Sequence, residues 1–227
     1  MEPRRRSWAA EGAAAAGFVV VTASLALTPV RQLDLAVRDL ADAHRPEVAE
    51  TVALAVNRLG SGGLLTGAAV LLAAFLAVRR RSAWPLGPVV VAFLATVALT
   101  MPLKWLFHRA APHSPLPDDI EVRLFSQPGG LSYPSGHGVN TIVWYGVICL
   151  LLAPWLPAAA RRSIRWAPPA IVTVTGTYLG HHWLTDMAAG ILLGVVLDRL
   201  LARVPWPAPA VGEPVDHEVR GRFQRRS

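Results

Sequence analysis

The sequence predicts an all-α membrane protein, a bundle of six transmembrane helices with an amphipathic segment and a long loop on the extracytoplasmic side. Three observations predict this fold class. Apolar residues make up 53% of the 227 residues and charged residues only 16%, against about 25% charged residues in soluble domains. The apolar residues stand in runs of bilayer-spanning length rather than at the periods of surface helices or strands. The basic residues cluster in short groups between these runs.

Six apolar runs are predicted to cross the bilayer as helices. They are Gly12–Val30, Gly62–Val78, Ala83–Leu103, Gly138–Leu156, Trp166–His181 and Leu184–Leu201. We interpret the first run as a span and not as a cleaved signal peptide, because its apolar core is long and the cleavage signal near Thr28 is poor. Together the runs define a predicted membrane domain of residues 1–204.

The distribution of positive charge predicts the orientation. With the N-terminus in the cytoplasm, the cytoplasmic segments hold fifteen Lys and Arg residues and the outer segments hold seven. Positive residues favour the cytoplasmic side of a span, so we expect a multi-pass cell-membrane protein with both termini in the cytoplasm. The tail, residues 205–227, is rich in proline and then basic, and we expect it to be disordered and held against anionic headgroups.

Two outer segments are long enough to have structure of their own. Arg31–Ser61 alternates charged residues with Leu and Val, which predicts one or two amphipathic helices lying on the membrane or on the bundle. Lys104–Pro134 is rich in proline and longer than most loops. We expect it to be an ordered loop.

The composition also excludes several classes of function. The net charge of +7 could suit nucleic acid, but the basic residues form no continuous face with interleaved aromatic residues, so no nucleic-acid partner is expected. The single cysteine, Cys149, excludes an internal disulfide and a thiolate metal cluster.

Histidines gather on the side predicted to face outwards. Of the seven histidines, all but His217 are expected outside or at the outer membrane face. Among them, His137, His181 and His182 are expected to converge with Asp186 at the outer ends of the spans. Ionisable residues are costly to bury at the end of a span, and such a cluster is therefore a candidate functional site.

The segment Ser132–His137 predicts an anion-binding site. Pro134 ends the loop, and Ser135 can cap the helix that follows. The amides at Ser135 and Gly136 would then be free at a helix N-terminus, where phosphate binds readily. His137, in the first turn, adds an acid or base at the same place.

His182 and Asp186 form a second predicted pair, four residues apart at a helix start. The carboxylate can accept the proton of one imidazole nitrogen and leave the other nitrogen as a nucleophile or base. Lys104 ends an apolar span and is the only lysine in the chain. Its flexible point charge is suited to phosphate, and Arg109 follows five residues later.

Taken together, these motifs resemble the type-2 phosphatidic acid phosphatases, which are integral-membrane relatives of the vanadium haloperoxidases. The resemblance covers roughly residues 104–194. The family's Pro-Ser-Gly-His motif is complete at Pro134–His137, and its His, three residues, Asp pattern is present at His182 and Asp186. Lys104 with Pro112 fits the family's first motif, Lys, six residues, Arg-Pro.

The resemblance implies a mechanism that needs no metal and no cofactor. It implies that His182 attacks phosphorus, that Asp186 orients its imidazole, and that His137 protonates the leaving alkoxide. The substrate would be a lipid phosphate entering from the outer leaflet. The residues expected to bind it are Lys104, Ser135, Gly136, Arg109 and His181.

Two positions depart from the family pattern. Ala111 and Gly176 stand where the family carries arginines that bind the phosphate. A charge-assisted hydrogen bond contributes on the order of 1.5–3 kcal/mol. We expect Arg109 or Arg123 of the loop, or a histidine such as His181 or His108, to supply part of the missing contact.

Three functions remain open from the sequence. The first is a lipid phosphate phosphatase. The second is a lipid-linked phosphotransferase with an alcohol acceptor, because a singly charged phosphodiester needs less positive charge than a monoester. The third is a non-catalytic member of the family. Two rival sites are a zinc site formed by His137, His181, His182 and Asp186 and a serine-protease nucleophile at Ser135. A homodimer also remains open.

Overall fold

The computed structural model describes residues 7–207, and most of the predicted tail, from residue 208 on, lies outside them. In the described part every regular element is helical. The helices are α1 (Ala9–Ser24), α2 (Thr28–Ala43), α3 (Glu47–Asn57), the 3₁₀ turn η1 (Arg58–Gly60), α4 (Gly62–Arg80), α5 (Leu86–Phe107), α6 (Asp118–Glu121), α7 (Gly136–Leu151), α8 (Ala158–Tyr178) and α9 (Leu184–Leu201). The predicted all-α class is therefore confirmed.

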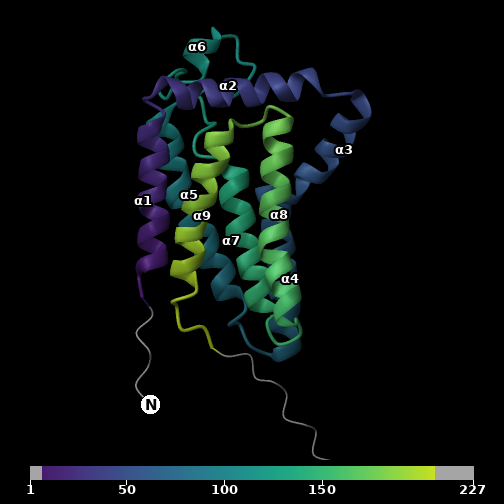
Figure 1. Ribbon diagram of the computed structural model, residues 1–227. Coiled ribbons are helices and arrows are strands. Elements are labelled where there is room, and N and C mark those ends of the chain that lie inside the picture. Colours follow the sequence, from purple (N-terminus) through teal and green to yellow (C-terminus); the bar gives the residue numbers. More distant parts are fainter. Residues whose placement is uncertain (1–6, 208–227) are drawn as a thin grey trace, which may run out of the picture.

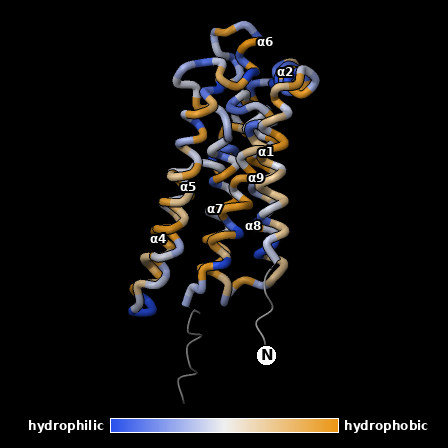
Figure 2. Tube along the Cα trace, turned by 90° about the vertical axis from the view of Figure 1, so that its left-hand side faces the viewer, coloured by the Kyte–Doolittle hydropathy of each residue, from blue (hydrophilic) through white to orange (hydrophobic). Residues whose placement is uncertain are grey.

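The long helices run alongside one another, and α2 lies across one end of the bundle with α6 beyond it (Figure 1). We call this end the α2 end. The described chain begins and ends at the opposite end (Figure 1). Hydrophobic residues dominate the middle stretches of the helices, and hydrophilic ones are most frequent towards the two ends (Figure 2). This is the distribution expected of a bundle embedded in a bilayer.

Each predicted span corresponds to one of the long helices. By length and composition, α4 and α5 can each cross a membrane, and the bent pair of α1 and α2 would add a third span. Helix α7 is apolar but has only 16 residues. Helix α8 contains three arginines near its start, and α9 contains two aspartates. These charges lower the hydropathy of helices that nevertheless lie within the bundle.

The first predicted span, Gly12–Val30, differs from the structure at its end. Helix α1 stops at Ser24, and the chain turns by 90° into α2. The turn has two local causes. Pro29 lies in the first turn of α2, where its missing amide hydrogen is not needed. The guanidinium of Arg31 donates to the carbonyl oxygens of Leu25 and Ala26, at 3.0 and 2.7 Å, which satisfies the end of α1.

Three further boundaries differ from the prediction by four residues or more. Helix α7 ends at Leu151 and not at Leu156. Helix α8 begins at Ala158 and not at Trp166, because its first two turns carry arginines that an apolar window leaves out. Helix α5 continues past Pro102 to Phe107. Lys104 therefore lies on a helix, and the loop predicted to start there begins at His108.

Close packing of α7 against α9 brings the histidine motifs together. A Cβ atom on Gly190 would lie 2.4 Å from the carbonyl oxygen of Ser135, and one on Gly138 would lie 3.0 Å from that of Met187. Only glycine permits this approach, because any side chain would push the two backbones apart. The start of α7 and the start of α9 are thereby held side by side at the α2 end.

Candidate active site

His182 and Asp186 meet at the start of α9. The Nδ1 atom of His182 lies 3.6 Å from Oδ2 of Asp186. The hydroxyl of Ser132 donates to the same oxygen at 2.5 Å and lies 3.4 Å from His182 Nδ1. The backbone amide of Trp183 also donates to it, at 3.1 Å. Since Nδ1 faces the carboxylate, Nε2 is the nitrogen of His182 that remains for a ligand.

His137 faces this pair from the first turn of α7. Its ring centroid lies 5.6 Å from that of His182, nearly edge to face, and 6.5 Å from that of His181. Gly60 of η1 closes the other side, where an added Cβ would come within 3.0 Å of the His137 ring. The three histidines and Asp186 thus converge at the α2 end, as the sequence predicts.

A buried ion-pair network lies behind Asp186. Arg109 is fully buried, and its guanidinium donates to Asp186 Oδ1 at 2.6 Å and to Asp34 Oδ2 at 2.7 Å. Asp34, on α2, also accepts from the amide and hydroxyl of Thr185 at 3.0 and 2.6 Å. The network ties α2, the long loop and the start of α9 to the carboxylate beside His182.

Arg109 therefore differs from its expected role. The sequence predicts it as a phosphate contact, but its side chain has no exposed surface and is engaged by two carboxylates, Thr185 and the carbonyl oxygen of Val122. In this structure the guanidinium of Arg109 is hydrogen-bonded to Asp186 and has no exposed surface at which a ligand could contact it.

Ser135 and Gly136 also differ in part from the expectation. Ser135 caps α7 as predicted, because its hydroxyl oxygen accepts from the amide of Gly138 at 3.2 Å. Its own amide, however, donates to the carbonyl oxygen of Asp186 at 3.0 Å, and its side chain is buried. The Ser135 amide is thus not free for an anion. Gly136 is half-buried and lies next to the Cε atom of Lys104.

Lys104 lies where a cavity between α4, α5 and α7 opens towards the start of α7. Its ammonium donates to the carbonyl oxygen of Leu131. The cavity has a volume of about 430 Å³ and is lined by Gly136, Asn140 and apolar side chains such as Phe93 and Trp144. It extends from Lys104 along the apolar faces of the helices.

The other residues that were expected to contact phosphate do not all lie beside the histidines. His181 is exposed and lies beside His137. Arg123 instead binds Asp119, at 2.8 Å, on the surface of the loop. The Nδ1 atom of His108 accepts from the amide of Gly129 at 3.2 Å, within the same loop. Of these three residues, only His181 lies with the cluster.

The geometry supports neither the rival zinc site nor the rival serine nucleophile. In residues 7–207, no group of three or more His, Cys, Asp or Glu side chains is arranged to hold a metal ion. The four residues of the zinc hypothesis therefore do not form a ligand set. The buried hydroxyl of Ser135 donates to the sulfur of Met187 and not to a histidine, so it lacks the base that a serine nucleophile needs.

Three residues of the site have contacts that the sequence does not predict: Asp34, Asn57 and Ser132. Ser132 stands just before the Pro-Ser-Gly-His motif and could have been found by extending the motif. Asp34 and Asn57 lie more than 40 residues before the first motif. Their burial, 1% and 4% exposed, is the relevant signal, and only the fold reveals it.

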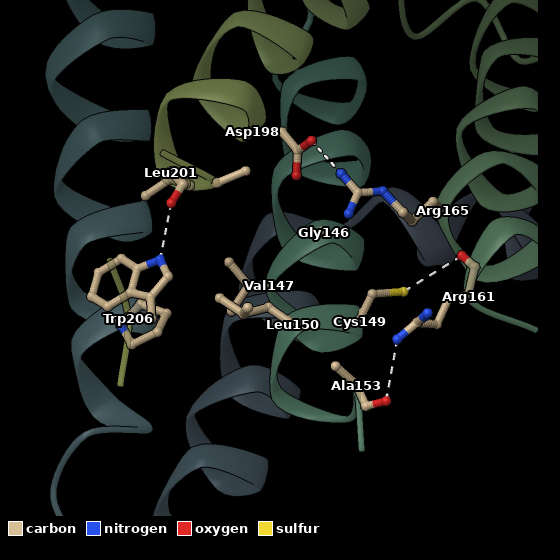
Figure 3. Close-up of a pocket in the computed structure, with 12 residues that line it drawn as sticks. Gly146, Val147, Cys149, Leu150, Ala153, Arg161, Arg165, Asp198, Leu201 and Trp206 are labelled. Carbon is tan, nitrogen blue, oxygen red and sulfur yellow. Dashed lines mark hydrogen bonds and ion pairs between the residues drawn. The ribbon is translucent and has the colours of Figure 1, made fainter. Parts of the chain in front are cut away.

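Figure 3 shows a second cavity, which has a volume of about 270 Å³. By the residues that line it, this cavity lies at the end of the bundle opposite the α2 end. Its polar groups are paired with one another. Arg165 binds Asp198, Arg161 donates to the carbonyl oxygen of Ala153, and Cys149 lies 3.6 Å from the carbonyl oxygen of Arg161. With its charged side chains engaged in this way, we assign no chemistry to this cavity.

The chain is similar to known proteins in sequence and in fold. The chain is 25% identical over 185 residues to phosphatidylglycerophosphatase B of Bacillus subtilis, covering 79% of this chain and 87% of that protein. It also matches the crystal structure of a transmembrane PAP2-type phosphatidylglycerolphosphate phosphatase from Bacillus subtilis. The TM-score is 0.71 at 23% identity, over 86% of this chain and 95% of the other.

The sequence profile of the PAP2 superfamily matches residues 85–209, more than half of the chain. The matched region contains Lys104, His137, His182 and Asp186, and it includes α5 and α7 to α9. With the shared transmembrane fold and the PAP2 motifs together at the α2 end, the chain is a membrane protein that belongs to the PAP2 superfamily.

Proposed function

We propose that the protein is a lipid phosphate phosphatase that acts through a phosphohistidine intermediate. One observation carries the proposal. His137 and His182 stand with ring centroids 5.6 Å apart, and the Nδ1 atom of His182 lies 3.6 Å from the buried Asp186. These distances support the proposal, because a nucleophile, its orienting carboxylate and an acid at such separations can all reach one phosphorus atom.

The geometry suggests the following steps. Nε2 of His182 attacks phosphorus and forms a P–N bond, while the P–O bond to the lipid alcohol breaks. His137 gives a proton to the departing oxygen, and Asp186 stabilises the positive charge on the His182 ring. Water then attacks the phosphohistidine, with His137 taking its proton, and the P–N bond breaks to release inorganic phosphate. Lys104 stabilises the charge on the phosphoryl oxygens.

The cavity beside Lys104 supports a lipid as the substrate. Its apolar lining suits a hydrocarbon chain, and Lys104 and Gly136 stand at the end nearest the start of α7. Phosphatidylglycerophosphatase B, to which the chain is similar, is by its name also an enzyme of a phosphorylated lipid. A phosphate ester with its chain in this cavity would present its headgroup between Lys104 and the histidines.

We further propose six spans, formed by α1, α4, α5, α7, α8 and α9, with both termini in the cytoplasm and the α2 end outside. Basic residues favour this orientation: Arg79, Arg80 and Arg81 lie at the end opposite the histidines. The site would then face the extracytoplasmic side, and lipid would enter from the outer leaflet.

Release of inorganic phosphate from a lipid phosphate by the purified protein in detergent tests the function. We expect His182→Ala to lower the rate roughly a thousandfold or more, because the nucleophile is lost. The matched control is His44→Gln, an exposed histidine at the end of α2, which should retain wild-type activity. A wild-type protein that releases no phosphate, or a His182→Ala variant that is equally active, would contradict the proposal.

A second candidate is transfer of the phosphoryl-bearing group to an alcohol. The feature in its favour comes from the resemblance to the family motifs, by which Ala111 and Gly176 would stand at the positions of the two arginines. A singly charged diester would then be easier to bind than a dianion. Incorporation of a labelled alcohol acceptor without release of free phosphate would favour transfer over hydrolysis.

A further inference from the structure

The space beside Gly176 is filled by a residue from a distant helix. Asn57, the last residue of α3, is only 4% exposed. A Cβ atom built on Gly176 would lie 3.6 Å from Asn57 Oδ1 and 3.6 Å from the sulfur of Met187. The side-chain amide of Asn57 thus stands where a longer side chain at position 176 would begin.

The contacts of Asn57 determine how its amide is used. The hydroxyl of Thr175 can donate its one hydrogen to Asn57 Oδ1 or to the carbonyl oxygen of Ile171, each at 3.0 Å. The Nδ2 atom of Asn57, which can only donate, lies 3.1 Å from Nδ1 of His181. A ring nitrogen that accepts a hydrogen bond carries no proton, so the proton of the neutral His181 ring is on Nε2.

His181 is placed so that this Nε2–H group is available. It follows Gly180, whose φ of +67° ends α8 with a left-handed turn. The amide of His181 donates back to the carbonyl oxygen of Gly176 at 3.0 Å. Its ring lies 6.5 Å from that of His137, and among the described residues Nε2 has no partner.

The surroundings of His181 favour the neutral ring. Partial burial is the largest factor that lowers its pKa, followed by the nearby His182 and Arg45. Of the charges behind the site, those of Arg109, Asp34 and Asp186 are engaged with one another. A neutral donor in this position adds hydrogen bonding without adding charge.

We propose that Asn57 positions His181 as an Nε2–H donor to a phosphoryl oxygen, in place of the guanidinium that the family motif carries at position 176. Asn57 acts as a positioning residue and His181 as the group that contacts the phosphate. This inference rests on the proposed function in that both concern the same phosphate site, but it can be tested without turnover.

The direct test is nitrogen NMR of the full-length protein labelled at histidine, with inorganic phosphate as the probe and His181→Gln used for assignment. We expect the wild-type His181 signal to be that of a ring protonated at Nε2, and we expect it to shift when phosphate is added. In Asn57→Leu the ring should become a mixture of tautomers. A proton on Nδ1 in the wild type, or an Nε2 signal that phosphate leaves unchanged, would overturn the proposal.

Steady-state kinetics on a lipid phosphate provide the second test. Loss of one neutral hydrogen bond should raise KM on the order of 3- to 10-fold in Asn57→Leu and in His181→Leu, with kcat changed less than about twofold. Because both residues act through one contact, the double variant should be no worse than either single variant. Additive losses, or a fall in kcat alone, would contradict the assignment.

The matched control is Thr177→Val, on the same helix, because Thr177 donates only to backbone carbonyl oxygens of α8. It should keep the wild-type KM. The NMR test also separates two failures. A protein that shows the Nε2–H ring and binds phosphate but releases none would refute the phosphatase function and leave the Asn57–His181 pair standing.

Discussion

Asp186 shows how a single side chain can be fixed from several directions. One of its oxygens is bound by Arg109, and the other is bound by Ser132 and the amide of Trp183. A buried carboxylate is costly unless donors surround it. These donors also leave it little freedom to rotate, so the His182 ring beside it has a fixed partner. At the residue scale, the site depends on this prior orientation.

His181 leads to a prediction about pH. Its pKa is lowered in the folded protein, mainly by burial and then by His182 and Arg45, from an ordinary value of about 6.5. At a pH below this ordinary pKa, the unfolded chain binds more protons at His181 than the folded chain does. The contribution of the neutral ring to the free energy of unfolding is therefore complete above pH 6.5 or so and is lost as the pH falls below about that value. We expect the melting temperature to fall more between pH 7 and pH 5 in the wild type than in His181→Gln.

Thermal unfolding of both proteins in the same detergent at the two pH values measures this difference. Glutamine is a suitable comparison because its amide oxygen can still accept from Asn57 Nδ2 and its side chain cannot take up the proton. Parallel decreases in the two proteins would show that His181 is not the group responsible.

Single residues also show what sequence patterns can and cannot predict. His137, His182 and Asp186 were expected because each lies in a short motif whose spacing implies its partner. Asp34 was not expected, because it stands between Leu33 and Leu35 in a segment whose pattern is that of an ordinary amphipathic helix. Its role depends on a partner, Arg109, that lies 75 residues away, and no local pattern encodes that contact.

At the scale of helices, the separation of α7 and α9 sets the geometry of the site. The Cβ atom that Gly190→Ala would add lies 2.4 Å from the carbonyl oxygen of Ser135, a backbone atom that cannot move alone. We expect a loss of stability of about 1–3 kcal/mol from overpacking. We also expect a strong loss of activity, because His137 would move away from His182.

The matched control is Gly67→Ala on α4, where an added Cβ meets nothing within 4 Å. Alanine is the better helix former, so this variant should be at least as stable as the wild type and equally active. Unfolding and activity measured side by side for the two variants test the prediction. If Gly190→Ala behaves like Gly67→Ala, the close approach of α7 and α9 is not what holds the site together.

Several contacts attach helix α2 to the rest of the chain, and among them the ion pair between Asp34 and Arg109 is fully buried. Asp34→Ala would leave Arg109 buried with one carboxylate instead of two and would remove the acceptor for the Thr185 amide. Breaking a buried pair on one side typically costs about 3–5 kcal/mol. We therefore expect a large drop in stability, together with reduced turnover because Arg109 also contacts Asp186.

The matched control for Asp34→Ala is Asp39→Ala on the same helix. Asp39 is exposed and binds only Arg38, and exposed pairs of this kind contribute little. Denaturation of the two variants in detergent should show a loss for Asp34→Ala alone. Equal stability of the two would mean that α2 is held by other contacts.

Helix boundaries were predictable where hydropathy changes sharply and not elsewhere. Gly62–Val78 and Leu184–Leu201 agree with α4 and α9 to within two residues. The turn after Ser24 was missed because residues 25–30 remain apolar, so composition gives no sign that the chain leaves the bundle axis. Pro29 and Arg31 form the turn locally, and the tertiary contact between Asp34 and Arg109 then holds α2 across the end of the bundle.

At the scale of the whole molecule, the two ends of the bundle carry different charged groups. The histidines and Asp186 lie at the α2 end, whereas Arg79–Arg81, Arg161 and Arg165 lie at the other. The histidine cluster lies at one end and the arginine clusters at the other, and positive residues favour the cytoplasmic side of a membrane. The same difference between the ends predicts which groups a reagent outside the cell can reach.

Labelling with a membrane-impermeant maleimide tests that orientation. The native Cys149 is 3% exposed and is replaced by alanine to remove background. Single cysteines are then introduced at Ala43, at the end of α2, and at Ser82, in the turn between α4 and α5, both of which are exposed. In intact cells we expect Ala43→Cys to react and Ser82→Cys to react only after permeabilisation, because the bundle separates the two ends by the thickness of a bilayer.

The reverse pattern would place the histidines in the cytoplasm and overturn the proposed entry of lipid from the outer leaflet. Reaction at both sites in intact cells would mean that the six long helices do not all cross the membrane.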